Sequence, residues 1–181
     1  MGNLVTEYKN FLSQEDWDKV FHDYLLKPRW SFGHRSNISQ AYENIDQIPM
    51  YWEMSFKEEE FFTDYILDKI CQVTGMKFDL WNVYAGGNTF GTSGDIHHDD
   101  TRPNTYTFLY HASPDEWDPM MGGKTIFYPN YPSTDGGEYY EFTPNSGLLF
   151  PSNIKHYGEP VTKFFNGLRV CVAFKMVRVY N

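Results

Sequence analysis

The sequence predicts a mainly β protein with flanking helices (α+β), built as an antiparallel double sheet or jelly roll with helices packed on one sheet. From residue 77 onward, short β-prone segments alternate with Gly, Pro, Asn and Asp, whereas helical spacing of apolar residues is confined to residues 1–76. Aromatic residues make up 19% of the 181 residues, which favours strands and a large aromatic core. We therefore expect one domain over 1–181, with 1–76 as helical support and 77–181 as the jelly-roll core.

Two helices are expected in the N-terminal part. The first covers about 14–26, with Ser13 as its N-cap. The second covers about 57–73, and Gly75 stands where a C-terminal glycine cap belongs. Residues 30–52 between them are expected to be irregular, with at most short strands.

Strands are expected in the C-terminal part wherever β-prone runs lie between turn residues. These runs are near 78–85, 95–100, 104–111, 124–128, 138–142, 146–150 and 167–179. The longest connection, 113–123, is expected to be a loop beside a site.

Charge and cysteine content narrow the class of protein. The net charge is −9, which argues against nucleic-acid binding, and no window of 18 apolar residues predicts a membrane helix. Cys71 and Cys171 fit no zinc pattern, and each lies in an apolar run. We expect two reduced, buried thiols and a cytoplasmic protein.

The chemistry is concentrated in the run Asp95-Ile-His-His-Asp-Asp100. In a strand, residues i and i+2 share a face, so either His97 with Asp99 or His98 with Asp100 offers an imidazole and a carboxylate together. His156 is a candidate third ligand. Two histidines and one carboxylate suit Fe(II) with positions left open for a co-substrate and O₂. A polar turn that binds no metal is the alternative.

Arg169 opens the last long apolar strand. An arginine among apolar neighbours either points to solvent or is paired inside the protein. On an inward face it would suit a ligand carboxylate, which it can bind through two parallel hydrogen bonds.

Taken in order, these segments resemble the Fe(II)- and 2-oxoglutarate-dependent dioxygenases, especially the prolyl-4-hydroxylase-like branch. The resemblance covers about 78–178, and its motifs are Val83-Tyr84-Ala85-Gly86-Gly87, Phe90-Gly91 through Ile96-His97-His98-Asp99-Asp100, Tyr106–Tyr110, Trp117-Asp118-Pro119 with Gly122-Gly123-Lys124-Thr125, Gly147–Phe150, His156 and Gly167-Leu168-Arg169. The fold it implies is a double-stranded β-helix (jelly roll).

The resemblance also implies roles for individual residues. It places the metal on His97, Asp99 and His156, with Fe(II), 2-oxoglutarate and O₂ as cofactor and co-substrates. Arg169 would pair with the far carboxylate of 2-oxoglutarate, with Lys163 as the fallback anchor, and Tyr84 would add a hydrogen bond. The remaining expectations are Leu109 in the apolar wall of the pocket and Arg102 and Trp117 beside the substrate.

The reaction implied is hydroxylation of an unactivated C–H bond. The branch suggests a peptidyl proline in a peptide or protein, and a free amino acid or another small metabolite is the rival substrate. Two other classes of protein stay open on the residues alone. A cupin-like metalloenzyme would use the three ligands without needing Arg169, and a non-catalytic β-sandwich binding module would bind no iron.

Overall fold

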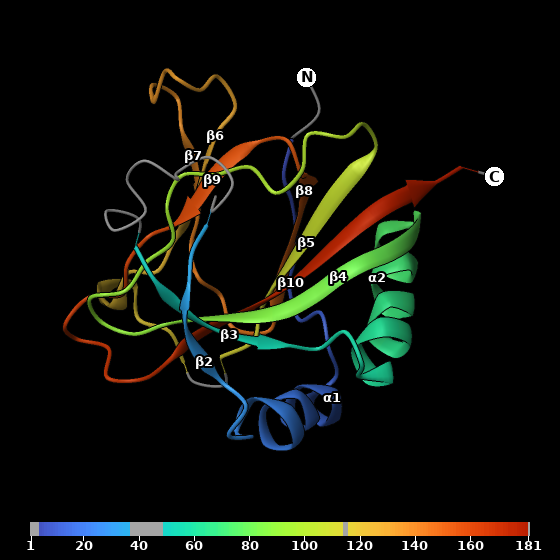
Figure 1. Ribbon diagram of the computed structural model, residues 1–181, viewed down its shortest axis with the longest axis horizontal. Helices are drawn as coiled ribbons and strands as arrows, with labels where there is room; N and C mark the ends of the chain where they lie inside the picture. Colours follow the sequence, from blue (N-terminus) through green and yellow to red (C-terminus); the bar gives the residue numbers. More distant parts are fainter. Residues whose placement is uncertain (1–3, 37–48, 114–115, 181) are drawn as a thin grey trace.

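The computed structural model describes residues 4–36, 49–113 and 116–180, which form a large and a small antiparallel sheet with helices on one side (Figure 1). The helical segments are α1 (Gln14–Lys19), η1 (Val20–Leu25), η4 (Phe61–Ile66), α2 (Leu67–Thr74) and η5 (Pro119–Met121); η1 and η4 are π-helical and run into α1 and α2, and η5 is a 3₁₀ turn. The strands are β1 (Thr6–Tyr8), β2 (Ser31–His34), β3 (Tyr51–Ser55), β4 (Lys77–Asn88), β5 (Thr105–His111), β6 (Thr125–Tyr128), β7 (Glu138–Tyr140), β8 (Ser146–Pro151), β9 (Lys155–Gly158) and β10 (Arg169–Val179). This confirms the mainly β class with flanking helices.

Both expected helices are present and end as their sequences indicate. The Ser13 side chain caps α1 by accepting the backbone N–H of Asp16 at 3.2 Å. Gly75 closes α2 in the left-handed conformation, with φ 66°. The second helix begins at Phe61, later than expected, because the chain first makes a turn in which the N–H of Glu59 bonds to the carbonyl of Phe56. No described helix is long and apolar enough to cross a membrane.

The large sheet has the strand order β1-β8-β5-β10-β4-β3-β2, and the small sheet has the order β7-β6-β9. Strand β10 is central, since it pairs with β4 on one side and β5 on the other. The strands expected near 78–85, 104–111, 124–128, 138–142, 146–150 and 167–179 are present as β4, β5, β6, β7, β8 and β10. The short strands β1 and β9 were not expected.

The strand expected at 95–100 was wrong. This segment is irregular, and His97 alone forms an isolated bridge, with His156 on β9. The physical reason is local hydrogen bonding. The Asp95 side chain accepts the backbone N–H of Ile96 at 2.8 Å, and the carbonyl of Asp95 bonds to the His97 ring at 2.8 Å. Such bonds offer the backbone an alternative to a strand ladder.

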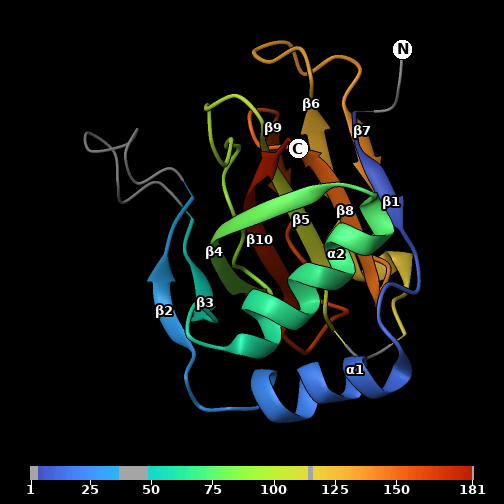
Figure 2. The same cartoon turned by 90° about the vertical axis from the view of Figure 1, so that its right-hand side faces the viewer.

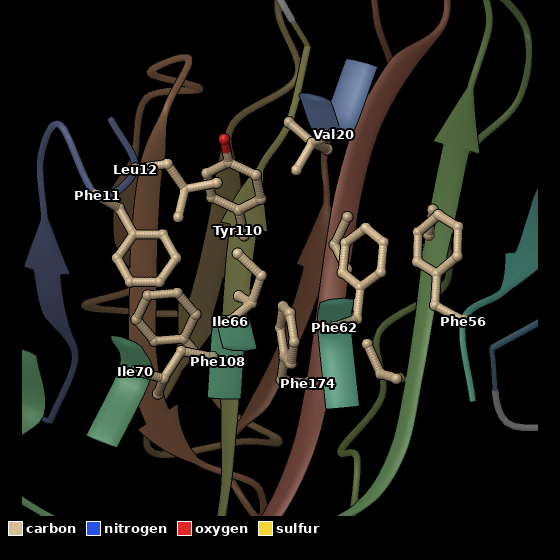
Figure 3. Packing of buried hydrophobic residues seen from close by; sticks show 14 of the residues in the cluster. Phe11, Leu12, Val20, Phe56, Phe62, Ile66, Ile70, Phe108, Tyr110 and Phe174 are labelled. Carbon is tan, nitrogen blue, oxygen red and sulfur yellow. The ribbon is translucent and has the colours of Figure 1, made fainter. Parts of the chain in front are cut away.

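The main core lies between the helices and one face of the large sheet (Figure 2). Figure 3 shows aromatic and aliphatic side chains from η1, η4, α2 and the sheet packed together, among them Phe62, Phe108 and Phe174. These three side chains are fully buried, so each contributes on the order of 2–3 kcal/mol of hydrophobic stabilisation.

The opposite face of the large sheet looks toward the small sheet. Alternation along β10 sends Val170, Val172 and Phe174 into the helix-side core and leaves Arg169, Cys171, Ala173 and Lys175 lining a cavity on the other side. A smaller apolar cluster closes the space beside this cavity; it contains Val5, Phe127, Leu148, Phe150 and Ile154. The fold thereby places the polar residues of β10 between the two sheets.

Candidate active site

The structure brings the three predicted metal ligands together at the cavity between the sheets. Their ligand atoms lie within 4.8 Å of one another. His97 Nε2 is 3.3 Å from Asp99 Oδ1, and His156 Nε2 is 3.7 Å from Asp99 Oδ2. His97 and Asp99 come from the irregular segment, whereas His156 comes from β9. Two imidazoles and one carboxylate at these separations are a donor set for a divalent transition metal.

Both imidazoles are oriented by their own backbone. Nδ1 of His97 bonds to the carbonyl of Asp95 at 2.8 Å, and Nδ1 of His156 bonds to the carbonyl of Ile154 at 2.9 Å. Because a carbonyl only accepts, each Nδ1 carries the proton and each Nε2 keeps its lone pair. This second layer of hydrogen bonds is typical of metal-binding histidines.

Asp99 is held from both of its oxygens. Thr107 Oγ1 donates to Oδ2 at 2.6 Å, and the Lys175 ammonium lies 2.5 Å from Oδ1. Burial acts to raise the pKa of Asp99, but Lys175, His156 and His97 outweigh it and hold that pKa well below its usual range. The carboxylate is therefore ionised and available to a cation.

Burial has the opposite consequence for His156. It lowers the pKa of this imidazole to about 3, although Asp99 acts to raise it. His156 is thus neutral, which is the protonation state that a metal ligand requires.

Arg169 lies at the other end of the cavity and is 3% exposed. Its Nε donates to the carbonyl of Gly123 at 2.8 Å, and its guanidinium lies over the ring of Phe142 at 4.8 Å. Among the described residues, its Nη2 has no hydrogen-bond partner, although it is buried. The same is true of Thr125 Oγ1, a second polar atom of the cavity lining. A buried guanidinium N–H and a buried hydroxyl that have no partner in the described protein suit an anionic ligand.

His111 adds a third unpartnered atom near Arg169. This fully buried imidazole accepts the Thr143 backbone N–H at 3.3 Å on Nδ1, where Ser146 Oγ is also 3.2 Å away. Nε2 therefore carries the proton, and it has no acceptor among residues 4–36, 49–113 and 116–180. Burial, with a smaller contribution from Arg169, lowers the pKa of His111 to about 3. The neutral Nε2–H donor of His111 thus lies close enough to the Arg169 guanidinium for its positive charge to lower the pKa of the imidazole.

Two further predicted residues, Tyr84 and Leu109, line the same cavity. Leu109 belongs to its apolar wall. The Tyr84 ring lies 5.7 Å from Lys175 Nζ, so it stands toward the metal end and not beside Arg169. Burial raises the pKa of Tyr84, which keeps its hydroxyl protonated.

The structure does not bring Arg102, Trp117 or Lys163 into the cavity lining. Arg102 pairs with Asp100 at 2.6 Å on the surface and lies over Trp81. Trp117 donates to the carbonyl of Gly122 at 2.9 Å and packs on Phe142 and Phe165, with ring centroids 4.3 and 4.6 Å away. Trp117 therefore packs against Phe142, the ring over which the Arg169 guanidinium lies. Lys163 lies over Phe164, which is exposed.

The residues that sequence reasoning missed include Thr125 and Lys175 in the cavity lining and His111 beside Arg169. The signal for Lys175 was present, because it follows Arg169 by an even number of positions in the same strand and so shares its face. The signal for His111 was likewise its even spacing from Leu109. Thr125 belongs to the predicted Gly122-Gly123-Lys124-Thr125 motif, and its residue type alone indicates no role.

Comparisons with known proteins identify the fold. No family model matches the sequence, and no curated protein matches it. Among solved structures, a 2OG-Fe(II) oxygenase family oxidoreductase from Burkholderia pseudomallei has a TM-score of 0.72 at 7% identity, over 98% of this chain and 87% of that one. A Pseudomonas putida prolyl-4-hydroxylase has a TM-score of 0.67 at 13% identity, over 99% and 95%. A Trichoplax adhaerens prolyl hydroxylase, solved with a peptide fragment of the hypoxia inducible factor, has a TM-score of 0.68 at 15% identity, over 97% and 84%.

These similarities cover almost the whole of this chain and most of each compared chain. At such low identity they establish architecture, and the site residues rest on the geometry described above. The chain has the jelly-roll fold of the 2OG-Fe(II) oxygenases, with structures of prolyl hydroxylases among its neighbours.

Proposed function

We propose that the protein is an Fe(II)- and 2-oxoglutarate-dependent dioxygenase that hydroxylates an unactivated C–H bond. The observation that carries this proposal is the joint lining of one cavity by a His-Asp-His donor set and by the unpartnered Nη2 of Arg169. The donor set suits a metal, and the guanidinium suits a carboxylate that reaches the metal from the far end of the cavity.

His97, Asp99 and His156 would hold the metal. Their chemistry fits Fe(II), because two neutral imidazoles and one carboxylate leave coordination positions open. When bound, the metal and the 2-oxo acid supply the oxidising chemistry, in which O₂ is consumed and the 2-oxo acid becomes succinate and CO₂. The protein's own contribution is to hold the ligands in their ionisation states and orientations.

Arg169 would anchor the far carboxylate of 2-oxoglutarate. Nη2 supplies a charged donor, Thr125 Oγ1 a hydroxyl donor, and His111 Nε2 is proposed as a third donor beside them. Phe142, with Trp117 behind it, fixes the plane of the guanidinium. Tyr84 is proposed to donate nearer the metal, at the end of the cavity where Lys175 lies.

Apolar side chains between the two ends would keep water away from the reacting atoms. Leu109, Cys171 and Ala173 line the middle of the cavity. Burial raises the pKa of the Cys171 thiol, so this residue behaves as a small apolar group and not as a thiolate. An apolar lining that excludes water protects a reactive oxidant from side reactions.

A peptidyl proline is the proposed substrate, and a free amino acid or another small metabolite is the alternative. The prolyl hydroxylases among the structural neighbours support this choice, and one of them is bound to a peptide fragment. A cytoplasmic location is proposed as well, since Cys71 and Cys171 are both free thiols.

The test is iron-dependent conversion of 2-oxoglutarate to succinate by the purified protein, measured alongside His97→Ala and Arg169→Ala. Loss of turnover in both variants supports the proposal. Metal-dependent oxidation that survives in Arg169→Ala would instead favour a cupin-like enzyme that does not use 2-oxoglutarate. A protein that binds neither iron nor 2-oxoglutarate would be the non-catalytic binding module.

A further inference from the structure

Lys175 is a second buried cation in the cavity. Its side chain is 7% exposed, and it lines the cavity from the same face of β10 as Arg169. A buried lysine is expected to be matched by acceptors, because its ammonium loses three hydrogen bonds to water.

The acceptors around Lys175 are too few. Among the described residues, Nζ meets Asp99 Oδ1 at 2.5 Å and the face of the Tyr84 ring at 5.7 Å. Asp99 satisfies one of the three N–H groups, which leaves two donors inside the cavity. Glu53, another acid that acts on Tyr84, does not line the cavity and pairs with His34 at 3.3 Å.

A charge count of the loaded site leads to the same conclusion. The two positive charges of a divalent metal cancel the two negative charges of the 2-oxo acid, and the histidines that bind the metal are neutral. The negative charge of Asp99 then offsets only one of the two positive charges on Arg169 and Lys175. One positive charge remains in a largely buried cavity. An uncompensated buried charge is costly, so the complete complex requires one more negative group.

That negative group does not come from 2-oxoglutarate under the proposed function. Its far carboxylate is assigned to Arg169, and its other carboxylate to the metal. The remaining molecule in the cavity is the substrate.

We propose that Lys175 binds a carboxylate of the molecule that is hydroxylated, and thereby selects an anionic substrate. The substrate then carries its own carboxylate, as a free amino acid or the C-terminal residue of a peptide does, and an internal proline, whose amides are neutral, does not fit. This inference rests on the proposed function, and it assigns Lys175 as a substrate-binding residue that fixes specificity.

The test compares acids with their matched amides on the loaded protein. The protein is saturated with Zn(II), which has no redox chemistry, and with 2-oxoglutarate. Thermal unfolding is then followed while L-proline or L-prolinamide is added, and the comparison is extended to the other L-amino acids, each with its amide. Wild type, Lys175→Met and Lys175→Gln are measured in parallel. Lys77→Met, which removes an exposed charge at the start of β4, is the matched control.

The expected result is a rise in melting temperature with at least one acid and not with its amide. The apparent affinity for that acid should fall at least ten-fold in both Lys175 variants and stay unchanged in Lys77→Met. The two neutral substitutions differ in shape, so a folding defect in one does not hide the answer. An L-proline effect would also identify the prolyl group itself.

Three outcomes of the acid and amide panel overturn the inference, and one result with 2-oxoglutarate does so as well. The first is equal binding of acids and amides, the second is acid preference that persists in the Lys175 variants, and the third is a panel in which no acid binds. A loss of 2-oxoglutarate affinity in Lys175→Met would show that the ammonium serves the co-substrate, and this too overturns it. Failure of the proposed function is a separate result, because it would appear as absence of iron-dependent succinate formation by the wild type.

Discussion

His97 and His156 hold each other in place through their backbones. The N–H of His97 donates to the carbonyl of His156 at 2.9 Å, and the N–H of His156 donates to the carbonyl of His97 at 2.8 Å. Their rings lie 4.4 Å apart, centroid to centroid. These two hydrogen bonds join the irregular segment 95–100 to β9 at His97, one of the proposed metal ligands. Because these bonds use no side-chain atoms, substitution of either imidazole leaves the bridge intact.

Removing one imidazole should therefore abolish metal binding without unfolding the protein. We expect His97→Ala to weaken Zn(II) binding at least 100-fold, since a two-residue site remains, while circular dichroism stays that of the wild type. His98→Ala is the matched control, because His98 is the neighbouring histidine that the alternative pairing would use. Titration of the metal-free protein with Zn(II) gives both affinities. An equal loss in His98→Ala would contradict the assigned ligand set.

The anchor for 2-oxoglutarate can be tested by comparing two cations. Arg169→Met should weaken 2-oxoglutarate binding about 30-fold or more, because the substitution removes a desolvated charge partner. Thr125→Val should cost about ten-fold, the scale of one hydrogen bond. Lys163→Met should change the affinity by less than about two-fold, since Lys163 does not line the cavity. Calorimetric titration of the Zn(II)-loaded protein decides the point, and a larger effect at Lys163 would make that residue the anchor.

The sequence predicted the helices and the long strands because their patterns are local. The β-prone runs of β4, β5 and β10 and the caps at Ser13 and Gly75 can be recognised without tertiary information. Strands β1 and β9 form because β8 and β6 are beside them, and this pairing between distant segments is not visible in the local sequence.

The sequence indicated the metal ligands and the arginine of the site. It did not indicate the backbone conformation that presents them or the buried cation beside them. His97, Asp99, His156 and Arg169 were found from motif order, and the structure brings them to one cavity. The supposed strand through His97 was wrong, since contact with β9 and not strand pairing along 95–100 presents the ligand. Lys175 was missed because an isolated lysine in an apolar strand shows its partner, Asp99, only after folding.

The stability of the metal-free protein should fall in acid because of its buried neutral histidines. The pKa of His111 is about 3 in the folded protein and about 6.5 when unfolded, so between these values the unfolded chain binds a proton that the folded chain does not. The free energy of unfolding therefore decreases as pH falls, by about 1.4 kcal/mol per pH unit for each such histidine. His156 acts in the same direction.

Substituting His111→Gln should reduce this pH dependence by about one proton. The measurement is urea unfolding at about pH 7.5, 6.5 and 5.5, a window that covers the titration of histidine in the unfolded chain and lies above the range near pH 4 where Asp99 and other carboxyl groups titrate there. His22→Gln, at an exposed position in η1, should keep the wild-type slope. Identical slopes for wild type and His111→Gln would mean that this imidazole is not held neutral by burial.

Gly147 and Phe108 form a close contact that should control the packing of the main core. A Cβ on Gly147 would overlap the ring of Phe108, which is fully buried between β8 and the helices. We expect Gly147→Ala to lower the free energy of unfolding by about 1–3 kcal/mol, the usual cost of overpacking. Phe108→Leu alone should also destabilise, by loss of aromatic contacts with Phe11 and Phe174. In the double variant the smaller leucine makes room for the new methyl group. The double variant should therefore lose less free energy of unfolding than the sum of the two single losses. Urea unfolding of the wild type, the two single variants and the double variant measures this coupling. Strict additivity would show that the ring of Phe108 is not the cause of the loss in Gly147→Ala.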